Sequence, residues 1–158
     1  MKGLLRVTLA CLAVSALVIG VQATVAPHSF YTGFPGGRGW VELLPPYNEH
    51  LTRDVGAFYL AFALLFAWAA VTLERALIVP LAVAWSLFSV LHAAFHITHL
   101  DGFSTGDAIA QTAGLLAVIA LPLLILSWAR PPRTGRRARP PAPDPAAPAS
   151  AGSASRAS

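Results

Sequence analysis

The sequence predicts an all-α protein, a four-helix transmembrane bundle with both termini in the cytoplasm and a disordered C-terminal tail. Of its 158 residues, 56% are apolar and 11% are charged, whereas soluble domains carry about 25% charged residues. The apolar residues gather into four runs, each near the ~20 residues that a helix needs to cross a bilayer. We therefore divide the chain into a membrane domain over residues 1–129 and a tail over residues 130–158.

The first predicted span covers residues 7–25 and follows the basic residues Lys2 and Arg6. As a helix this run is about 28 Å long, close to the hydrocarbon thickness of a bilayer. A basic start, an apolar run and small residues near Ala23 also fit a cleaved signal peptide. We favour a retained span, because the run is long for a signal core.

Residues 26–48 form a loop rich in aromatic residues, Gly and Pro, here called the aromatic loop. Pro35 and the neighbouring glycines are expected to break any regular element. Aromatic rings with polar tips favour the headgroup region of a bilayer. We expect this loop to lie on the membrane surface or to fold over the helix ends as a lid.

The second predicted span covers residues 49–73 and begins after Asn48, which is a good N-cap. Its first two turns hold Glu49, His50, Arg53 and Asp54. Glu49 and Arg53 lie four residues apart, as do His50 and Asp54, so both pairs can meet on the helix surface.

The third predicted span covers residues 76–100 and carries His92, His96 and His99. On a helix these three lie within about 60° of one another, with Trp85 and Ser89 on the same side. Ionisable groups in a spanning helix are costly, so they normally face other helices or a wet cavity. This face is the main candidate for function.

The fourth predicted span covers residues 105–128. Ser104 precedes it and Asp107 follows three residues later, a spacing that resembles a capping box with Asp in place of Glu. Pro, Ala, Ser and Arg dominate residues 130–158, which have no apolar periodicity and are expected to be disordered.

The distribution of basic residues predicts the orientation of the spans. Lys2, Arg6, Arg75 and the arginines of the tail share one side, while only Arg38 and Arg53 lie on the other. By the positive-inside rule the termini are cytoplasmic in a multi-pass plasma-membrane protein. The tail is then expected to meet anionic lipids of the inner leaflet. The basic residues form no folded module, which argues against nucleic acid as a partner.

This orientation gathers the polar side chains of four spans in their outer halves, where they are expected to line an outward-facing polar cup. The leading hypothesis is that the cup binds a transition metal, such as zinc, copper or iron, a haem, or another small ligand. The predicted ligand groups are His92, His96, Glu49, Asp54 and Asp107. The predicted supporting groups are Arg53, Tyr59, Gln111, His99 and His50.

Two other functions remain open on the sequence. The protein is either an accessory subunit whose polar network only fixes helix packing, or a quinone- or proton-linked redox or transport component. Partners beyond the lipid bilayer include another protein or a second copy of the chain. No catalytic residue is assigned, and the sequence leans against an enzyme. The single cysteine, Cys11, excludes an internal disulfide.

Three segments carry a resemblance to an uncharacterised group of small actinobacterial four-helix membrane proteins. These are Phe30-Tyr31-x-x-Phe34-Pro35-Gly36-Gly37, Leu44-Pro45-Pro46-Tyr47-Asn48-Glu49-His50-Leu51-x-Arg53-Asp54-Val55-Gly56 and His92-x-x-x-His96-x-x-His99-Leu100-Asp101-Gly102-Phe103. The general plan is also similar to DoxX-like membrane proteins, some of which serve quinone-dependent redox systems. Both resemblances imply four spans, and neither assigns an activity to particular residues.

Overall fold

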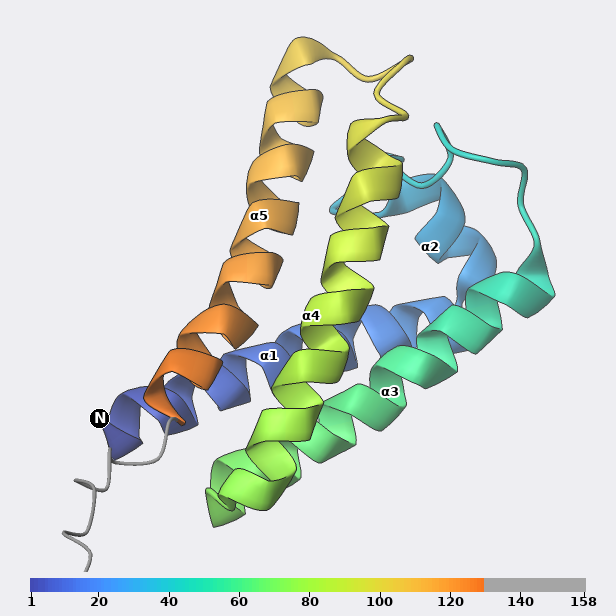
Figure 1. The fold of residues 1–158 in the computed structure, drawn as a ribbon. Coiled ribbons are helices and arrows are strands. Elements are labelled where there is room, and N and C mark those ends of the chain that lie inside the picture. The colour runs from blue at the N-terminus through green and yellow to red at the C-terminus, as the bar shows by residue number, and fades with distance from the viewer. Residues whose placement is uncertain (130–158) are drawn as a thin grey trace, which may run out of the picture.

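The computed structural model describes residues 1–129, and the predicted all-α fold class is confirmed (Figure 1). The helices found in this part of the chain are α1 (Lys2–Val25), α2 (Pro27–Gly33), α3 (Glu49–Thr72), α4 (Arg75–Ile97) and α5 (Thr105–Trp128). The predicted tail and its contact with anionic lipids concern residues 130–158, which lie outside the described residues.

Four of these helices, α1, α3, α4 and α5, are long and apolar enough to cross a membrane. Each has 23 or 24 residues. Large apolar side chains such as Leu64, Trp68 and Val71 on α3 are exposed on the outside of the bundle, where lipid is the solvent that suits them. The chain is therefore a multi-pass membrane protein.

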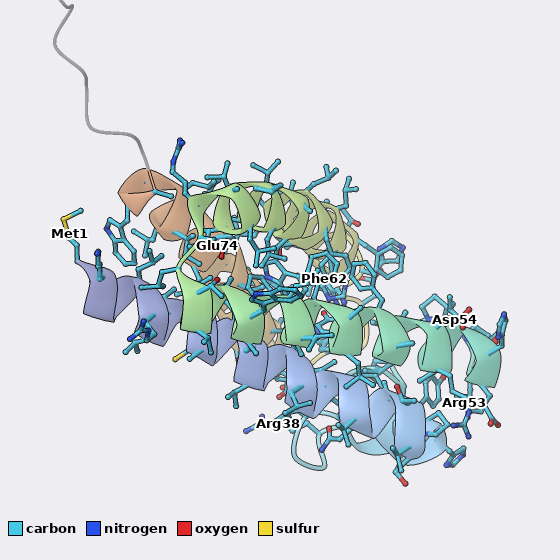
Figure 2. The ribbon with its side chains drawn as sticks, turned by 90° about the horizontal axis from the view of Figure 1, so that it is seen from below. Met1, Arg38, Arg53, Asp54, Phe62 and Glu74 are labelled. Atoms are coloured by element: carbon cyan, nitrogen blue, oxygen red, sulfur yellow. The ribbon has the colours of Figure 1, made fainter. Side chains whose placement is uncertain are left out.

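The four long helices are arranged as two close pairs. Helix α1 packs along α3, and α4 packs along α5, whereas the contacts between the two pairs are fewer (Figures 1 and 2). The α1–α3 pair is tight because glycines lie at its contact. A Cβ atom on Gly56 would lie 2.7 Å from the backbone nitrogen of Thr24, and one on Gly20 would lie 2.9 Å from that of Leu60. Small residues of this kind let membrane helices approach closely.

The two pairs meet at one end of the bundle, which we call the closed end. It holds the start of α1, the turn between α3 and α4, and the end of α5 (Figure 1). Its core contains Leu9, Phe66, Ile78 and Ile125, all of which are 1% exposed or less. From this end the pairs run in different directions and separate toward the other end, which we call the open end (Figure 1).

Two arginines tie the helices together at the closed end. Arg6 Nε donates to the carbonyl of Ala70 at 2.9 Å, near the end of α3. Arg75 Nε donates to the carbonyl of Ala129, which caps α5. Cations at helix C-termini satisfy carbonyls that have no partner within the helix and complement the negative end of its dipole.

The predicted helix starts at the open end are confirmed. The Asn48 side chain accepts a hydrogen bond from the Leu51 backbone N–H at 3.0 Å, and Ser104 Oγ accepts one from the Asp107 backbone N–H at 3.1 Å. Each cap satisfies a backbone donor of the first turn. Figure 2 shows Arg53 and Asp54 at this end of α3, with Glu74 just beyond its other end.

Two helix boundaries differ from the expectation by more than one residue, and one helix was not expected. Helix α1 already begins at Lys2, and α4 ends at Ile97, so His99 follows the helix instead of belonging to it. The aromatic loop also contains a short helix, α2, that was not expected. Pro27 stands at its N-terminus, where the missing N–H costs nothing. Helix α2 ends at Gly33, just before Pro35 and the glycines that were expected to interrupt regular structure.

Candidate functional site

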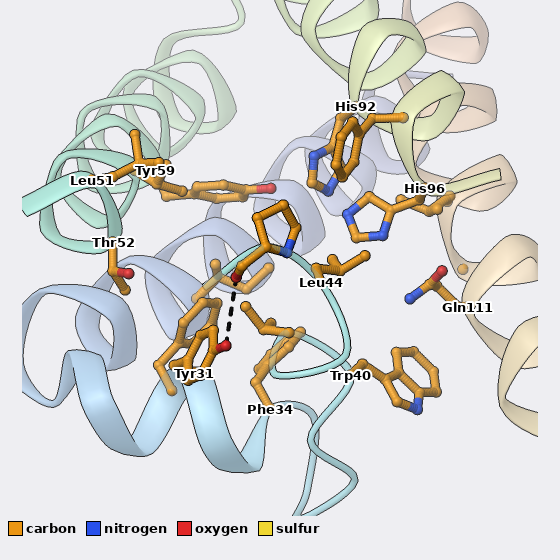
Figure 3. Close-up of a pocket in the computed structure, with 18 of the residues that line it drawn as sticks. Tyr31, Phe34, Trp40, Leu44, Leu51, Thr52, Tyr59, His92, His96 and Gln111 are labelled. Carbon is orange, nitrogen blue, oxygen red and sulfur yellow. Dashed lines mark hydrogen bonds between the residues drawn. The ribbon is translucent and has the colours of Figure 1, made fainter. Parts of the chain in front are cut away.

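A cavity of about 540 Å³ lies at the open end, between the two helix pairs (Figure 3). Its walls come from the first half of α3, the second half of α4 and the first half of α5, and the aromatic loop covers it. The lining residues named below are Tyr31, Phe34, Trp40, Leu44, Tyr59, Phe88, Ser89, His92, His96, Gln111 and Gly114.

Helix α4 supplies the imidazoles of the cavity. The rings of His92 and His96 lie 4.4 Å apart between centroids, as expected for side chains one helical turn apart on the same face. His92 also stacks on Phe88 with 5.3 Å between centroids and 16° between the ring planes. Both imidazoles are half-buried and point into the cavity (Figure 3).

Helix α3 supplies Tyr59, which is 8% exposed. Its ring meets Phe88 edge-to-face, with 5.6 Å between centroids, and meets Trp85 in the same way at 5.6 Å. Phe62 and Phe66 extend this aromatic cluster toward the closed end. Edge-to-face contacts hold aromatic rings in defined orientations, so the bottom of the cavity is a rigid aromatic surface.

Helix α5 contributes Gln111 and Gly114. Gln111 is 5% exposed and lies opposite His96 (Figure 3). Gly114 lies one turn further along the helix, and a Cβ atom on it would have no heavy atom within 4 Å. The missing side chain of Gly114 therefore leaves part of the cavity free.

The aromatic loop closes the cavity through Tyr31, Phe34, Trp40 and Leu44 (Figure 3). The loop is fastened to the start of α5. Trp40 Nε1 donates to Asp107 Oδ1 at 3.0 Å, and Arg38 Nη1 lies 2.5 Å from the same oxygen. The Tyr31 hydroxyl donates to the carbonyl of Pro45 at 3.5 Å. These bonds hold aromatic side chains over the space between the helices.

The cavity wall is uncharged but polar at defined points. None of the described residues that line it is Asp, Glu, Lys or Arg. Three polar atoms in the wall, Ser89 Oγ, His96 Nδ1 and Gln111 Oε1, are buried without a hydrogen-bond partner within residues 1–129. An unpaired buried polar atom costs about 1–3 kcal/mol. Most buried polar groups have a partner, so three exceptions in one wall mark a place that suits a ligand.

The structure brings together four of the predicted site residues, His92, His96, Tyr59 and Gln111, in the cavity wall. The remaining predicted groups lie elsewhere. Arg53 Nε pairs with Glu49 Oε1 at 2.9 Å, and His50 Nε2 lies 3.3 Å from Asp54 Oδ2. Asp107 holds the aromatic loop. The His99 ring stacks on Phe95 with 4.1 Å between centroids.

The predicted site residues lie at the same end of the bundle, but they do not all belong to one site. Glu49, His50, Arg53 and Asp54 occupy exposed positions on the first two turns of α3, where each finds a partner four residues away. In residues 1–129, no group of three or more His, Cys, Asp or Glu side chains is arranged to hold a metal ion. The imidazole pair is therefore separate from the carboxylates that were expected to join it.

Some cavity residues were not among the predicted site residues. The helical spacing predicts the correct face of α4 for Ser89 but indicates no role for it. Phe34, Trp40 and Leu44 come from the aromatic loop, for which a lid over the helix ends was one of two expectations. The signal in the sequence was the density of aromatic residues between Pro27 and Pro46.

Comparisons with known proteins add no relative to this description. No family model, curated protein or solved structure matches the chain.

Proposed function

We propose that this membrane protein binds a small, uncharged, lipid-soluble molecule in the cavity between its two helix pairs. The observation that supports this most directly is an aromatic cavity of about 540 Å³ whose wall contains unpaired polar atoms. Ligand pockets measure about 300–1,000 Å³ and are mostly apolar with a few well-placed polar groups. The cavity fits this description in both size and chemistry.

The lack of charged side chains in the cavity wall favours a neutral ligand. A charged group within the span is costly unless a partner of opposite charge accompanies it. Arg38 and Asp107, which meet the lining residue Trp40 at the edge of the cavity, already pair with each other. An uncharged molecule dissolved in the bilayer needs no such partner, and it reaches the protein by diffusion in the lipid.

A metal ion is the second candidate, and the contact between His92 and His96 favours it. Two imidazoles one turn apart can chelate one ion, but a stable site needs further ligands. The carboxylates Glu49, Asp54 and Asp107 are paired elsewhere, so exogenous ligands would have to complete the shell. Metal analysis of the purified protein and of His92→Ala tests this candidate. A stoichiometric metal that is lost in the variant would replace our proposal.

The proposal is tested by photolabelling the protein in lipid nanodiscs with an uncharged alkyl probe that carries a diazirine. We expect saturable labelling of peptides from the cavity wall, and competition by the same molecule without the diazirine. Gly114→Phe places a ring in open space of the cavity, so the probe must displace it or bind elsewhere. Overpacking of this kind costs about 1–3 kcal/mol, and labelling should fall by at least about fivefold.

The matched control is Leu116→Phe, two residues further along α5. Leu116 is 54% exposed and does not line the cavity, so the same aromatic ring is added on the outside of the bundle. This variant should label like the wild type. Labelling that does not saturate, or that is equal in Gly114→Phe and the wild type, would contradict the proposal and favour a purely structural role.

We further propose that the cavity faces the outside of the cell at the plasma membrane, because the basic residues near the closed end favour the cytoplasm. In a Cys11→Ser background, His50→Cys places a thiol at the open end and Lys2→Cys places one at the closed end. Both positions are exposed. An impermeant maleimide added to intact cells should label only His50→Cys. Labelling of only Lys2→Cys would reverse the orientation.

A further inference from the structure

Three polar side chains of the described residues are buried, and they differ in whether their oxygen has a hydrogen-bond partner. They are Thr8, Ser89 and Gln111. The Thr8 hydroxyl donates to the carbonyl of Leu4 at 3.0 Å in its own helix, so it is satisfied. Ser89 is 2% exposed and Gln111 is 5% exposed, and both line the cavity with an oxygen that has no partner within residues 1–129.

We infer that the ligand is a phenol, whose hydroxyl is bound between His96 and Gln111 and whose ring lies against Phe88 and His92. This inference rests on the proposed function, because it names the chemical class of the molecule that fills the same cavity. Its basis is the hydrogen-bonding pattern of two unpaired atoms, His96 Nδ1 and Gln111 Oε1, together with the aromatic surface beside them.

The two unpaired atoms call for a group that both donates and accepts. Gln111 Oε1 is an amide oxygen and can only accept a hydrogen bond. His96 Nδ1 donates when it carries the proton of the neutral ring. A hydroxyl satisfies both at once, because it donates to the amide oxygen and accepts from the ring nitrogen. A carbonyl or an ether only accepts, and it would leave Gln111 Oε1 without a partner.

The aromatic surface beside these atoms favours a ring over a flexible chain. Phe88 and His92 are nearly parallel, with 16° between their planes, and the edge of Tyr59 closes the corner at 5.6 Å from Phe88. Aromatic rings prefer offset-stacked and edge-to-face neighbours. A ligand ring in this corner gains contacts of both kinds while its hydroxyl reaches toward α5.

The absence of charge in the wall separates a phenol from other amphipathic molecules. A fatty acid or a phosphate ester would bring a negative charge, and the described lining residues include no Lys or Arg to receive it. A phenol has a pKa near 10, like the Tyr side chain, and is neutral at physiological pH. Apolar substituents of the ring would then occupy the space beside Gly114.

The test compares para-hexylphenol with its methyl ether, para-hexylanisole, as competitors of the photolabel on the full chain in nanodiscs. The ether keeps the ring and the chain but cannot donate a hydrogen bond. Concentrations are expressed per lipid, after correction for partition into nanodiscs without protein. We expect the phenol to protect the cavity at an about tenfold lower concentration, as expected for one or two hydrogen bonds.

Gln111→Leu tests whether Gln111 binds the hydroxyl of the phenol, because leucine has a similar volume and no hydrogen-bonding atom. In this variant the phenol should lose its advantage to within about threefold, while protection by the ether stays as in the wild type. Persisting protection by the ether shows that the cavity is intact. If the variant does not fold, the comparison of the two competitors on the wild type decides.

Three results would overturn the inference. Equal protection by phenol and ether in the wild type would mean that the cavity binds uncharged molecules without recognising a hydroxyl. The proposed function would then stand, and the assignment of the ligand as a phenol would be wrong. A phenol preference that survives in Gln111→Leu would place its hydroxyl elsewhere. Labelling that neither competitor reduces would reject the phenol, and if the probe without its diazirine also fails to reduce it, the proposed function is rejected as well.

Discussion

The closed end and the open end of the bundle are built from the same four helices but are packed in opposite ways. At the closed end Phe66 and Ile125 are 0% exposed, and side chains from all four helices fill the space between the two pairs. At the open end the pairs separate, and the space between them is a cavity covered by the aromatic loop. The same four helices thus form a packed core at one end and a candidate site at the other.

The difference shows what holds a membrane bundle together and what it can leave unfilled. In lipid, apolar side chains gain little from leaving the solvent, so close packing and hydrogen bonds stabilise the fold. The closed end supplies the packing, and the α1–α3 contact extends it along one pair. The open end can therefore hold unpaired polar atoms at a cost that the rest of the bundle offsets.

Removing a packed aromatic ring at the closed end should have the largest effect. Phe66→Ala leaves a cavity among four helices and should lower the free energy of unfolding by about 3 kcal/mol or more. The matched variant is Phe95→Ala, whose ring is 40% exposed at the open end and should cost less than about 1 kcal/mol. Unfolding in mixed micelles with increasing denaturing detergent measures both. Equal losses would mean that the two ends are packed alike.

A smaller effect is expected from the glycines. Gly56→Ala places a methyl group 2.7 Å from the Thr24 backbone nitrogen, which forces α1 and α3 apart and should cost about 2 kcal/mol. Gly114→Ala adds the same methyl group to open space and should be neutral or stabilising by up to about 1 kcal/mol, because alanine favours a helix. If Gly114→Ala lost more stability than Gly56→Ala, the close packing of α1 against α3 would be contradicted.

Gln111→Leu should stabilise the protein without ligand by about 1 kcal/mol, because it removes a buried amide oxygen that has no partner. The same substitution abolishes the proposed recognition of a phenol, so stability and binding should change in opposite directions. Thermal unfolding of the ligand-free protein in detergent measures the change. A clear loss of stability would show that Gln111 is part of the packing and not of a site.

The smallest effect on stability is expected at the aromatic loop. Asp107→Asn weakens the bonds from Trp40 and Arg38 but leaves the helices packed, so the loss of stability should be smaller than in the variants above, as is usual for exposed ion pairs. Hydrogen–deuterium exchange of residues 36–44 should nevertheless become faster, because the loop is less firmly held. Asp101→Asn, at an exposed position nearby, is the control. Unchanged exchange in Asp107→Asn would mean that other contacts hold the loop.

The sequence alone determined the features that depend on neighbouring residues. Apolar runs of the length of a span predicted the four long helices, and Asn48 and Ser104 predicted where two of them begin. Spacings of four residues predicted the pairs of Glu49 with Arg53 and of His50 with Asp54, and one face of α4 for His92 and His96. All of these follow from the period of a helix, which acts within a few residues along the chain.

Only the tertiary structure decided which of these side chains share a site. It separated the acidic residues of α3 from the imidazoles of α4, although both lie at the open end, and it used Asp107 to fasten the loop. The close pairing of α1 with α3 depends on the contact of Gly56 with Thr24, and the cover of the cavity depends on the ion pair of Arg38 with Asp107. Such contacts join residues far apart in the chain, and hydropathy carries no record of them because lipid and protein interior are equally apolar.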